Sequence, residues 1–93
     1  MTKPINAILI DEKDNVATAI LELHQGDIGR YAAKGEMVEI AIAELIPKYH
    51  KFSVQDIRKT EPVRKYGEVI GEALQNIAKG AHVHVHNIIS PGR

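Results

Sequence analysis

Hydrophobic and polar residues alternate over short stretches of this sequence, a pattern that predicts a small, mostly β protein. The apolar residues 5–10 predict a first strand. Residues 27–43 predict a β-hairpin, because Lys34-Gly35 suits a turn and apolar residues then recur at every second position. Further short extended segments are predicted at residues 50–52, 63–66 and 69–74. These segments favour a compact fold made chiefly of strands.

Two helical stretches are expected among the strands. Apolar residues recur at helical spacing over residues 16–23, with Asn15 as the candidate cap and Gly26 where a helix commonly ends. Ser53 is expected to cap a helical turn over residues 54–57. The predicted fold class is therefore mostly β with short helices.

A weak repeat with a spacing of twenty residues is present in the second half of the chain. It matches Asp56-Ile57 with Asn76-Ile77, Lys59 with Lys79, and Val63 with Val83. Each copy predicts a helical turn, a tight turn and a strand. Two such units suggest pseudo-symmetric halves that close into a compact β structure.

Residues 80–87 hold three histidines at every second position, namely His82, His84 and His86. In a strand these side chains would share one face, with neighbours roughly 6.6 Å apart, while the two intervening valines face the core. Imidazoles on one face can bind a metal ion or transfer protons near neutral pH. A polar strand face without a function is the alternative, but clustered histidines favour a functional site.

The spacing of these histidines limits how they could bind a metal. Two neighbours on one strand can reach a common ion, whereas three in a row rarely converge on it. Since a catalytic metal normally takes at least three protein ligands, we expect His82, His84 and His86 to share a metal site with residues of a partner chain. In the metal-free alternative, one histidine donates a proton and the others bind substrate.

Cationic side chains elsewhere could bind an anionic substrate group. Lys51 and Lys65 are the candidates, and Tyr66 adds a hydroxyl donor. Arg64 alternates away from Lys65 and is better explained as an ordinary surface residue. For Lys65 itself, a solvated surface role remains an equal alternative.

Composition narrows the class of protein. Twelve basic residues balance twelve acidic ones, and only one phenylalanine and three tyrosines occur without tryptophan, so nucleic acid is an unexpected partner. Cysteine is absent, which excludes disulfides and thiol catalysis. The 93 residues predict a single domain, and they contain neither a signal peptide nor a stretch long enough to span a membrane. We therefore expect a cytoplasmic protein.

Several motifs in the second half of the chain resemble one known family. They are His50-Lys51-Phe52, Val63-Arg64-Lys65-Tyr66-Gly67, Ile70-Gly71, Asn76-Ile77, Lys79-Gly80 and His82-Val83-His84-Val85-His86-Asn87. In this order they resemble the SAF domain of the altronate dehydratase family, and Asp14-Asn15-Val16-Ala17 looks like the opening segment of that domain. The sequence departs from the family at Tyr49, where glycine is usual, and at Asn76, where aspartate is frequent. Tyr49 could reshape the loop that carries His50.

The resemblance implies a β-clip fold, with residues 1–93 forming one SAF domain. Residues 88–93 end in turn-forming residues, so we expect them to form a mobile tail or to lead toward a partner. The resemblance also implies a lyase that removes the C3 substituent of a hydroxy acid, with Fe²⁺ or Mn²⁺ held mainly by a large subunit. In such a reaction a base removes the C2 proton and an acid assists the leaving group. By itself, this chain is expected to be inactive.

From these implications we expect the chain to be the small subunit of a two-component altronate dehydratase. His84 and His86 are the candidate catalytic residues. The candidates for substrate binding are His50, Lys51, Lys65, Tyr66 and Asn87. The expected partners are the large subunit and a small hydroxy acid, and the isolated chain could form a homo-oligomer. Two alternatives stay open: the alpha subunit of a sulfolactate sulfo-lyase, and a non-catalytic module that binds a sugar acid or a partner.

Overall fold

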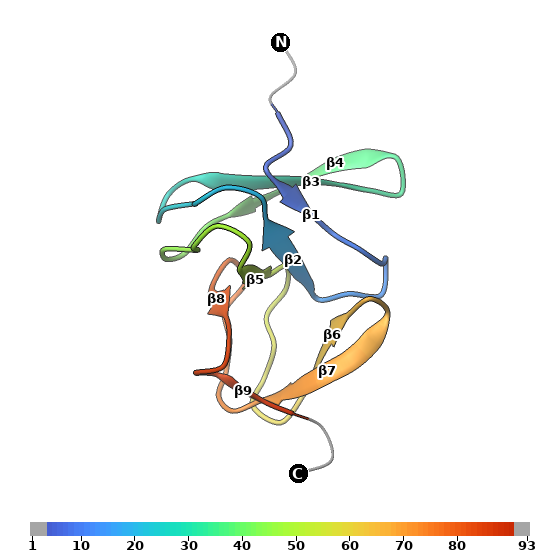
Figure 1. Cartoon of the computed structure of the whole chain (residues 1–93), viewed down its shortest axis with the longest axis vertical. Coiled ribbons are helices and arrows are strands. Elements are labelled where there is room, and N and C mark those ends of the chain that lie inside the picture. Colours follow the sequence, from blue (N-terminus) through green and yellow to red (C-terminus); the bar gives the residue numbers. More distant parts are fainter. Residues whose placement is uncertain (1–3, 91–93) are drawn as a thin grey trace.

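A computed structural model describes residues 4–90, which form nine short strands (Figure 1). The strands are β1 (Ala7–Ile8), β2 (Val16–Ala19), β3 (Ile28–Ala33), β4 (Glu36–Ala41), β5 (Lys51–Ser53), β6 (Pro62–Lys65), β7 (Glu68–Ala73), β8 (His82–Val83) and β9 (Ile88–Ile89). None of these residues forms a helix. The all-strand architecture is consistent with the β-clip fold, and only the short helices of the predicted fold class are missing.

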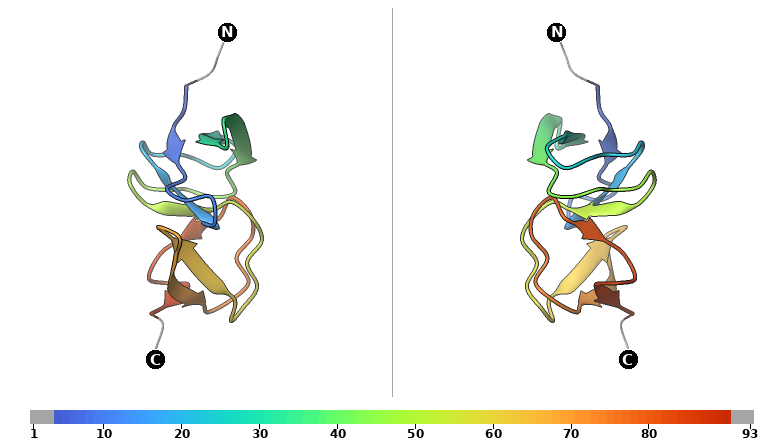
Figure 2. Two further views of the ribbon diagram at one scale, coloured as in Figure 1. Left: turned by 90° about the vertical axis from the view of Figure 1, so that its right-hand side faces the viewer. Right: turned by 90° about the vertical axis from the view of Figure 1, so that its left-hand side faces the viewer.

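The strands form three antiparallel sheets along the long axis of the molecule. A four-stranded sheet with the order β1-β2-β5-β8 lies in the middle, the hairpin β3-β4 lies at one end, and the sheet β6-β7-β9 lies at the other (Figures 1 and 2). The central sheet therefore joins two terminal hairpins. No helix in the described part of the chain is long and apolar enough to cross a membrane.

Each hairpin is closed at its base by a pair of backbone hydrogen bonds. Leu23 and Ile46 exchange N–H···O bonds of 2.9 and 2.8 Å below β3-β4, and Ile57 and Ile77 exchange bonds of 2.8 and 2.7 Å below β6-β7. A tight turn begins one residue after each of these four positions. In each turn the third residue has a positive φ, at Gly26 (91°), Tyr49 (70°), Thr60 (77°) and Gly80 (88°). Each half of the chain thus contains the same unit, a hairpin with a bridged residue pair and two tight turns at its base.

Two asparagines repeat the same contacts in the two halves. Asn6 donates its backbone and side-chain N–H groups to the carbonyls of Arg30 and Ile28, and its Oδ1 accepts the Arg30 N–H. Asn15 makes the same three bonds to β6: its N–H groups donate to the carbonyls of residues 64 and 62, and its Oδ1 accepts the Arg64 N–H. Because side-chain amides bind the free edges of β3 and β6, neither edge is left unpaired at these positions.

The hydrophobic core is divided between the two halves. One cluster packs Phe52 and Tyr31 with aliphatic residues from β1 to β5, and Phe52 is fully buried. The other cluster packs Val16, Val63 and Val83 with isoleucines from the β6-β7 half. The central strands supply side chains to both clusters, so they hold the halves together.

The sequence predictions are confirmed for the hairpin and for two short extended segments, and they are wrong for the helices. The hairpin at residues 27–43 forms with Lys34-Gly35 as its two-residue turn, and the segments near 63–66 and 69–74 form β6 and β7. Residues 16–23, predicted as a helix, instead form β2 and an extended segment. Because β2 is paired on both sides and buried on both faces, its run of small and β-branched residues lacks the alternation that usually marks a strand.

Two smaller predictions also need correction. Ser53 ends β5 and caps no helix, because residues 54–57 continue into the bridge at Ile57. The first strand is confined to Ala7–Ile8 within the predicted 5–10. In the predicted tail, Ile88–Ile89 form β9 and pair with β7, while residues 91–93 lie outside the described residues.

The repeat of twenty residues corresponds to the two flanks of the hairpin β6-β7. These flanks lie side by side and exchange equivalent bonds: the Lys59 N–H donates to Asn76 Oδ1 and the Lys79 N–H donates to Asp56 Oδ1, each over 2.9 Å. Asn76 Oδ1 therefore accepts the same hydrogen bond that the carboxylate of Asp56 accepts at the equivalent position. The helical turn predicted in each copy is wrong, whereas the tight turn is confirmed.

Candidate functional site

The histidine segment is only partly a strand. His82 and Val83 form β8, opposite Phe52 and Lys51 of β5, and the chain then turns over residues 84–87. Val83 is buried as predicted, but Val85 is 77% exposed and the prediction that it faces the core is wrong. The three histidines therefore do not share a strand face.

They nevertheless gather in one stack, which also includes His50 from the turn before β5. Ring centroids lie 5.1 Å apart for His50 and His82, 4.3 Å for His50 and His84, 5.6 Å for His82 and His84, and 5.1 Å for His82 and His86. The interplanar angles are between 14° and 27°. The pairing of β5 with β8 thus joins His50 to a cluster that the sequence placed on a single strand.

The stack offers nitrogen donors that a metal ion could use. Ligand atoms of His50, His82 and His84 all lie within 4.8 Å of one another. The Nδ1 atom of His50 lies 2.9 Å from Nε2 of His82, close to the separation of about 3.3 Å between two nitrogens on one tetrahedral zinc. Chemistry and spacing therefore fit a divalent transition metal. His86, predicted as a third ligand, lies outside this group.

The ring planes show what metal binding would require. A ligating imidazole holds its metal close to the plane of its own ring, so rings that bind one ion must point their nitrogens toward a common point. The nearly parallel rings of His50, His82 and His84 do not yet do so. Binding would require at least two of the rings to turn, which side-chain rotation allows at a half-buried site.

Neighbouring charges disfavour protonation of the stack. Burial lowers the pKa of the His82 imidazole, and the positive charges of the other stacked histidines lower it further, while Glu44 opposes them. The pKa of His84 is lowered by slight burial and then by the charges of His50 and Lys51. Neutral rings are therefore favoured, and a neutral imidazole can bind a metal or accept a proton.

The turn that carries His84 is held by Asn87. This buried side chain donates from Nδ2 to the His82 carbonyl over 2.8 Å, and its Oδ1 accepts the His84 N–H over 2.9 Å. Both ends of the amide are thus bonded to the backbone of the histidine segment. The predicted substrate contact is untested, but the structure gives Asn87 a clear role in shaping the turn.

Gly80, just before β8, bonds to the end of β5 and passes close to Ala41 at the end of β4. Its N–H donates to the Ser53 carbonyl over 2.8 Å, and its own carbonyl accepts the Ala43 N–H over 3.0 Å. A Cβ atom here would lie only 2.1 Å from the Ala41 carbonyl oxygen. Only glycine allows this approach, which places His82 beside His50.

Lys51 lies near the stack, where its charge acts on His84, and Lys65 in turn lies near enough to Lys51 for its charge to act there. Burial lowers the pKa of Lys51, and the charge of Lys65 lowers it further. Within the described residues, the structure pairs neither lysine with a carboxylate. Two close ammonium groups without a counter-ion are arranged to attract an anion.

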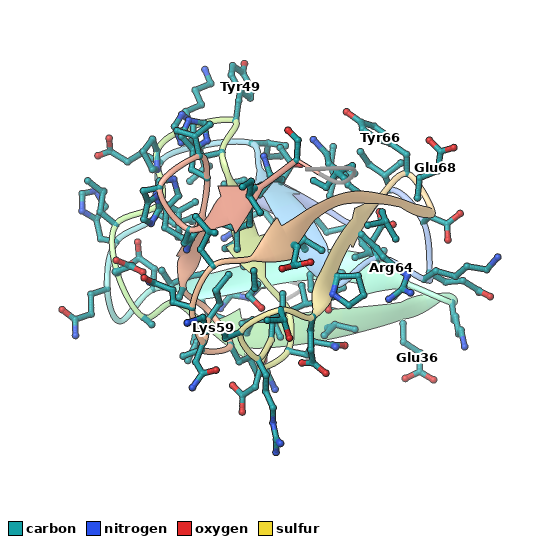
Figure 3. All side chains as sticks on the ribbon, turned by 90° about the horizontal axis from the view of Figure 1, so that it is seen from below. Glu36, Tyr49, Lys59, Arg64, Tyr66 and Glu68 are labelled. Atoms are coloured by element: carbon teal, nitrogen blue, oxygen red, sulfur yellow. The ribbon has the colours of Figure 1, made fainter. Side chains whose placement is uncertain are left out.

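Two exposed tyrosines lie on turns in this half of the site, Tyr49 before β5 and Tyr66 between β6 and β7. Tyr49 and Tyr66 project toward the same edge of the molecule, whereas Glu36 and Lys59 project toward the opposite edge (Figure 3). The Lys65 Nζ lies 4.8 Å from the centroid of the Tyr66 ring. The structure therefore brings the predicted residues Lys65 and Tyr66 together.

The loop before β5 has the same backbone conformation as the equivalent loops that contain glycine, although it carries Tyr49. It adopts a φ of 70°, close to the values at Gly26 and Gly80. The turn still closes through a 3.0 Å bond from the His50 N–H to the Pro47 carbonyl. The departure from the family pattern therefore costs backbone strain without displacing His50 from His82.

The structure adds three polar residues, Glu44, Thr18 and Asp14, to which the sequence analysis assigned no role in the site. Glu44 accepts the His82 N–H over 3.1 Å, and Thr18 pairs with Lys51 across the sheet. The Thr18 hydroxyl is buried without a hydrogen-bond partner in the described structure. Asp14 accepts the N–H groups of the Tyr66-Gly67 turn. All three depend on contacts between distant segments, which spacing along the chain does not reveal.

Comparison with known proteins identifies relatives of the whole described chain. The sequence model of the altronate/galactarate dehydratase SAF domain matches residues 5–91. Altronate dehydratases of Bacillus subtilis and Escherichia coli are each 39% identical over 80 residues, which cover 86% of this chain and 15% of theirs. The (2R)-sulfolactate sulfo-lyase subunit alpha of Chromohalobacter salexigens is 31% identical over 87 residues, covering 90% of this chain and 93% of that subunit. The chain thus spans about 15% of the length of the altronate dehydratases and nearly all of the sulfo-lyase subunit.

Proposed function

The chain belongs to the family of altronate/galactarate dehydratase SAF domains, and on that premise we propose that it is the small subunit of a two-component hydroxy-acid lyase. The proposed reaction removes water from altronate to give 2-keto-3-deoxygluconate. The C2 proton and the C3 hydroxyl leave as water, and the resulting enol tautomerises to the keto acid. This reaction needs a group that binds the carboxylate, a base and an acid.

One observation carries the proposal: a stack of four imidazoles lies near Lys51, which pairs with no described carboxylate. Lys51 and Lys65 suit the substrate carboxylate because their positive charges are close together and unneutralised. Tyr66, beside Lys65, can donate its hydroxyl to the substrate. The remaining predicted contact is His50, on the turn before β5.

Proton transfer is proposed for the exposed end of the stack. His86 is the exposed ring of the stack, and the lowered pKa of the half-buried His84 favours the neutral form that accepts a proton. His50, His82 and His84 are the residues of this chain that would hold a divalent ion, Fe²⁺ or Mn²⁺, together with ligands from the larger chain; with His84 bound to that ion, His86 would be the proton acceptor. Such an ion would stabilise the negative charge that develops on the substrate when its C2 proton is removed.

The large subunit is proposed because the site is open and small. The stack lies at the surface, where His86 is exposed and His50, His82 and His84 are half-buried. A lyase site normally surrounds its substrate and excludes water. In the altronate dehydratases the matching segment is a minor part of one long chain, so the remaining surface would come from a second protein here.

Sulfolactate is the second candidate substrate, and a specific observation favours it. The relative that matches along nearly its whole length is named as a sulfo-lyase subunit. Elimination of sulfite from C3 needs the same base and the same carboxylate contact as elimination of water. Lys51 and Lys65 would suit either anion.

The test is to co-purify the chain with a large subunit of its own organism and to assay altronate and sulfolactate separately. We expect turnover of one substrate by the complex and none by the chain alone. His84→Ala should reduce kcat of the complex by about 10²-fold or more. His24→Ala is the control, since His24 lies outside the stack and pairs with Glu22.

Two different outcomes would contradict two different parts of the proposal. A complex that forms but turns over neither acid would support the module that only binds a partner or a sugar acid. Unchanged turnover in His84→Ala and His86→Ala would remove these residues from the proposed catalytic site.

A further inference from the structure

Asp14 is a buried carboxylate that the proposed reaction does not use. Its side chain is only 6% exposed. Its Oδ1 accepts the Gly67 N–H over 2.8 Å, and its Oδ2 accepts the N–H groups of Tyr66 and Asp11, each over 3.1 Å. Three backbone donors therefore converge on one buried negative charge, a strong arrangement.

The other half of the molecule shows that this hairpin turn does not require a carboxylate. The turn Lys34-Gly35 between β3 and β4 has φ values of 51° and 77°, against 62° and 74° for Tyr66-Gly67. Asn6 binds the edge of β3 as Asn15 binds the edge of β6, but the residue before Asn6 is Ile5, which has no carboxylate. The turn backbone is the same, so Asp14 adds something beyond turn formation.

The added contact fixes where the turn lies relative to the central sheet. Asp14 comes directly before Asn15, which is bonded to β6, and β2 begins at the next residue. The carboxylate thus ties the tip of the β6-β7 hairpin to the strand that pairs with β5. Since β5 carries Lys51, the same contact controls the separation of the two halves of the proposed anion site.

The turn tip carries the groups that would face the anion. The Tyr66 ring lies 4.8 Å from the Lys65 ammonium, and both residues belong to the hairpin tip that Asp14 binds. A tyrosine at positive φ is strained, costing about 1–2 kcal/mol relative to glycine. A strained, exposed aromatic residue held by a buried carboxylate is typical of a side chain kept for function.

We propose that Asp14 is a positioning residue, which holds the Tyr66-Gly67 turn so that Lys65 and Tyr66 face Lys51 across a binding site for the carboxylate of a hydroxy acid. This inference rests on the proposed function for the identity of the anion. The juxtaposition itself rests on the three bonds to Asp14 and on the matched turn that lacks them.

The test uses four variants of the full chain, alone and in complex with its large subunit. Asp14→Asn keeps the shape but replaces one acceptor oxygen with a donor that opposes the backbone N–H groups. Tyr66→Asn removes the ring, and asparagine tolerates the positive φ. This variant therefore measures the contribution of the Tyr66 side chain while the backbone bonds to Asp14 are kept. The double variant completes a cycle, and Lys34→Asn is the matched control in the other hairpin.

In Asp14→Asn, amide exchange at Tyr66 and Gly67 should accelerate by about tenfold or more, while exchange at Lys34 and Gly35 stays unchanged. In the complex, KM for the hydroxy acid should rise about fivefold or more in Asp14→Asn and in Tyr66→Asn, with a smaller change in kcat. The KM of the double variant should not exceed the higher of the two single-variant KM values, because Asp14 acts through the turn. Additive effects, or an unchanged KM together with accelerated exchange, would reduce Asp14 to a purely structural residue.

Binding to the chain alone separates this inference from the proposed reaction. We would titrate the isolated chain with malate, a simple hydroxy acid, and follow the side-chain resonances of Lys51 and Lys65. Asp14→Asn should weaken malate binding about fivefold or more relative to the wild-type chain. If malate binds in this way but no complex turns over altronate or sulfolactate, the proposed reaction fails and the positioning role stands. The inference would be overturned if malate caused no shift in the lysine resonances, or if Asp14→Asn bound malate as tightly as the wild-type chain does.

Discussion

The Nδ1 atom of His50 lies 2.9 Å from the Nε2 atom of His82, so a residue of the turn before β5 is hydrogen-bonded to a residue of β8. Such a bond needs one nitrogen with a proton and one without. The pair therefore tolerates at most one additional proton before both nitrogens carry hydrogen and repel each other. This links the packing of two distant segments to the protonation of their side chains.

This link makes the folded chain sensitive to mild acid. The pKa of His82 is lowered from its ordinary value of 6.5 by burial and by the other stacked histidines, and the pKa of His84 is lowered in the same direction. Well above pH 6.5 both the folded and the unfolded chain hold these rings neutral. As the pH falls below 6.5, the unfolded chain takes up protons first, so the free energy of unfolding decreases until the lowered pKa values are passed.

Urea denaturation between pH 7.5 and 5 measures this decrease. His82→Gln should flatten the profile, and His24→Gln, outside the stack, should leave it unchanged. A wild-type profile that is flat between pH 7 and 5 would contradict the lowered pKa values.

Gly80 and Gly26 should respond differently to alanine although they occupy the same position in equivalent turns. Their φ values are 88° and 91°, so both substitutions carry the strain of a left-handed alanine, about 1–2 kcal/mol. A Cβ at Gly26 meets no atom within 4 Å, whereas one at Gly80 meets the Ala41 carbonyl oxygen at 2.1 Å. We therefore expect Gly26→Ala to lose about 1 kcal/mol and Gly80→Ala to lose on the order of 3 kcal/mol or more.

Denaturation curves of the two variants give these values directly. In Gly80→Ala, the resonances of His50 and His82 should also shift, since β8 must move away from Ala41. Equal losses in the two variants would show that the close approach of β8 is unimportant for stability.

The hairpins were predictable because their signals are local. Lys34-Gly35 places two positive-φ residues between alternating apolar segments, and two-residue loops of this kind fit hairpins. The helix predicted at residues 16–23 failed because β2 is central and buried on both faces, so its sequence has no strand alternation. Whether a short apolar run is helix or strand is decided by its neighbours in space.

The site was predictable in its residue types and not in its geometry. Alternate histidines pointed to a cluster, and the cluster exists, but the strand ends at Val83 and a turn held by Asn87 brings the later rings back. His50 joins through the pairing of β5 with β8, a contact across 32 residues of sequence. Asp14 lies in a segment that resembles the opening of the family's domain, but its contact with the Tyr66-Gly67 turn, more than fifty residues away, depends on the fold.

Tyr49 carries backbone strain that glycine would remove. Its φ of 70° is unfavourable for any residue with a Cβ, and its side chain is 66% exposed. Its contact with the Lys48 ammonium, 4.9 Å from the ring, is of the exposed kind that contributes little. Tyr49→Gly should therefore stabilise the fold by about 1 kcal/mol, or about 5 °C in Tm for a chain of this size.

Calorimetry of Tyr49→Gly and Tyr49→Ala separates the two contributions. Alanine removes the ring but keeps the strain, so it should show no gain. Thr60→Gly, at the equivalent turn position with a φ of 77°, should be stabilised in the same way as Tyr49→Gly. A loss of stability in Tyr49→Gly would show that the ring contributes more than the strain costs.

Lys51 should limit the stability of the fold. Because burial and the Lys65 charge lower its pKa from 10.5, the folded state disfavours the charged form. At neutral pH the side chain is charged in both states, so this penalty applies in full, and it decreases as the pH rises through the lowered pKa toward 10.5. Lys51→Met should therefore raise Tm at pH 7, with a smaller gain at pH 10.

The same substitution should weaken substrate binding by the proposed complex, seen as a higher KM. Lys59→Met is the control, because Lys59 projects from the opposite edge of the molecule (Figure 3). A lower Tm in Lys51→Met would mean that its aliphatic chain packs better than that of methionine and that its charge is well tolerated.

Asn87 should act through the shape of the histidine turn. Its amide bonds the His82 carbonyl and the His84 N–H while its side chain is 3% exposed, so Asn87→Ala leaves two buried backbone groups unpaired. We expect this variant to lose about 2–3 kcal/mol of folding free energy, and the His84 ring to leave the stack. Asn76→Ala, which removes one exposed bond to the Lys59 N–H, should lose less than about 1 kcal/mol. A variant of Asn87 with full stability and a raised KM would instead establish the direct substrate contact expected from the sequence.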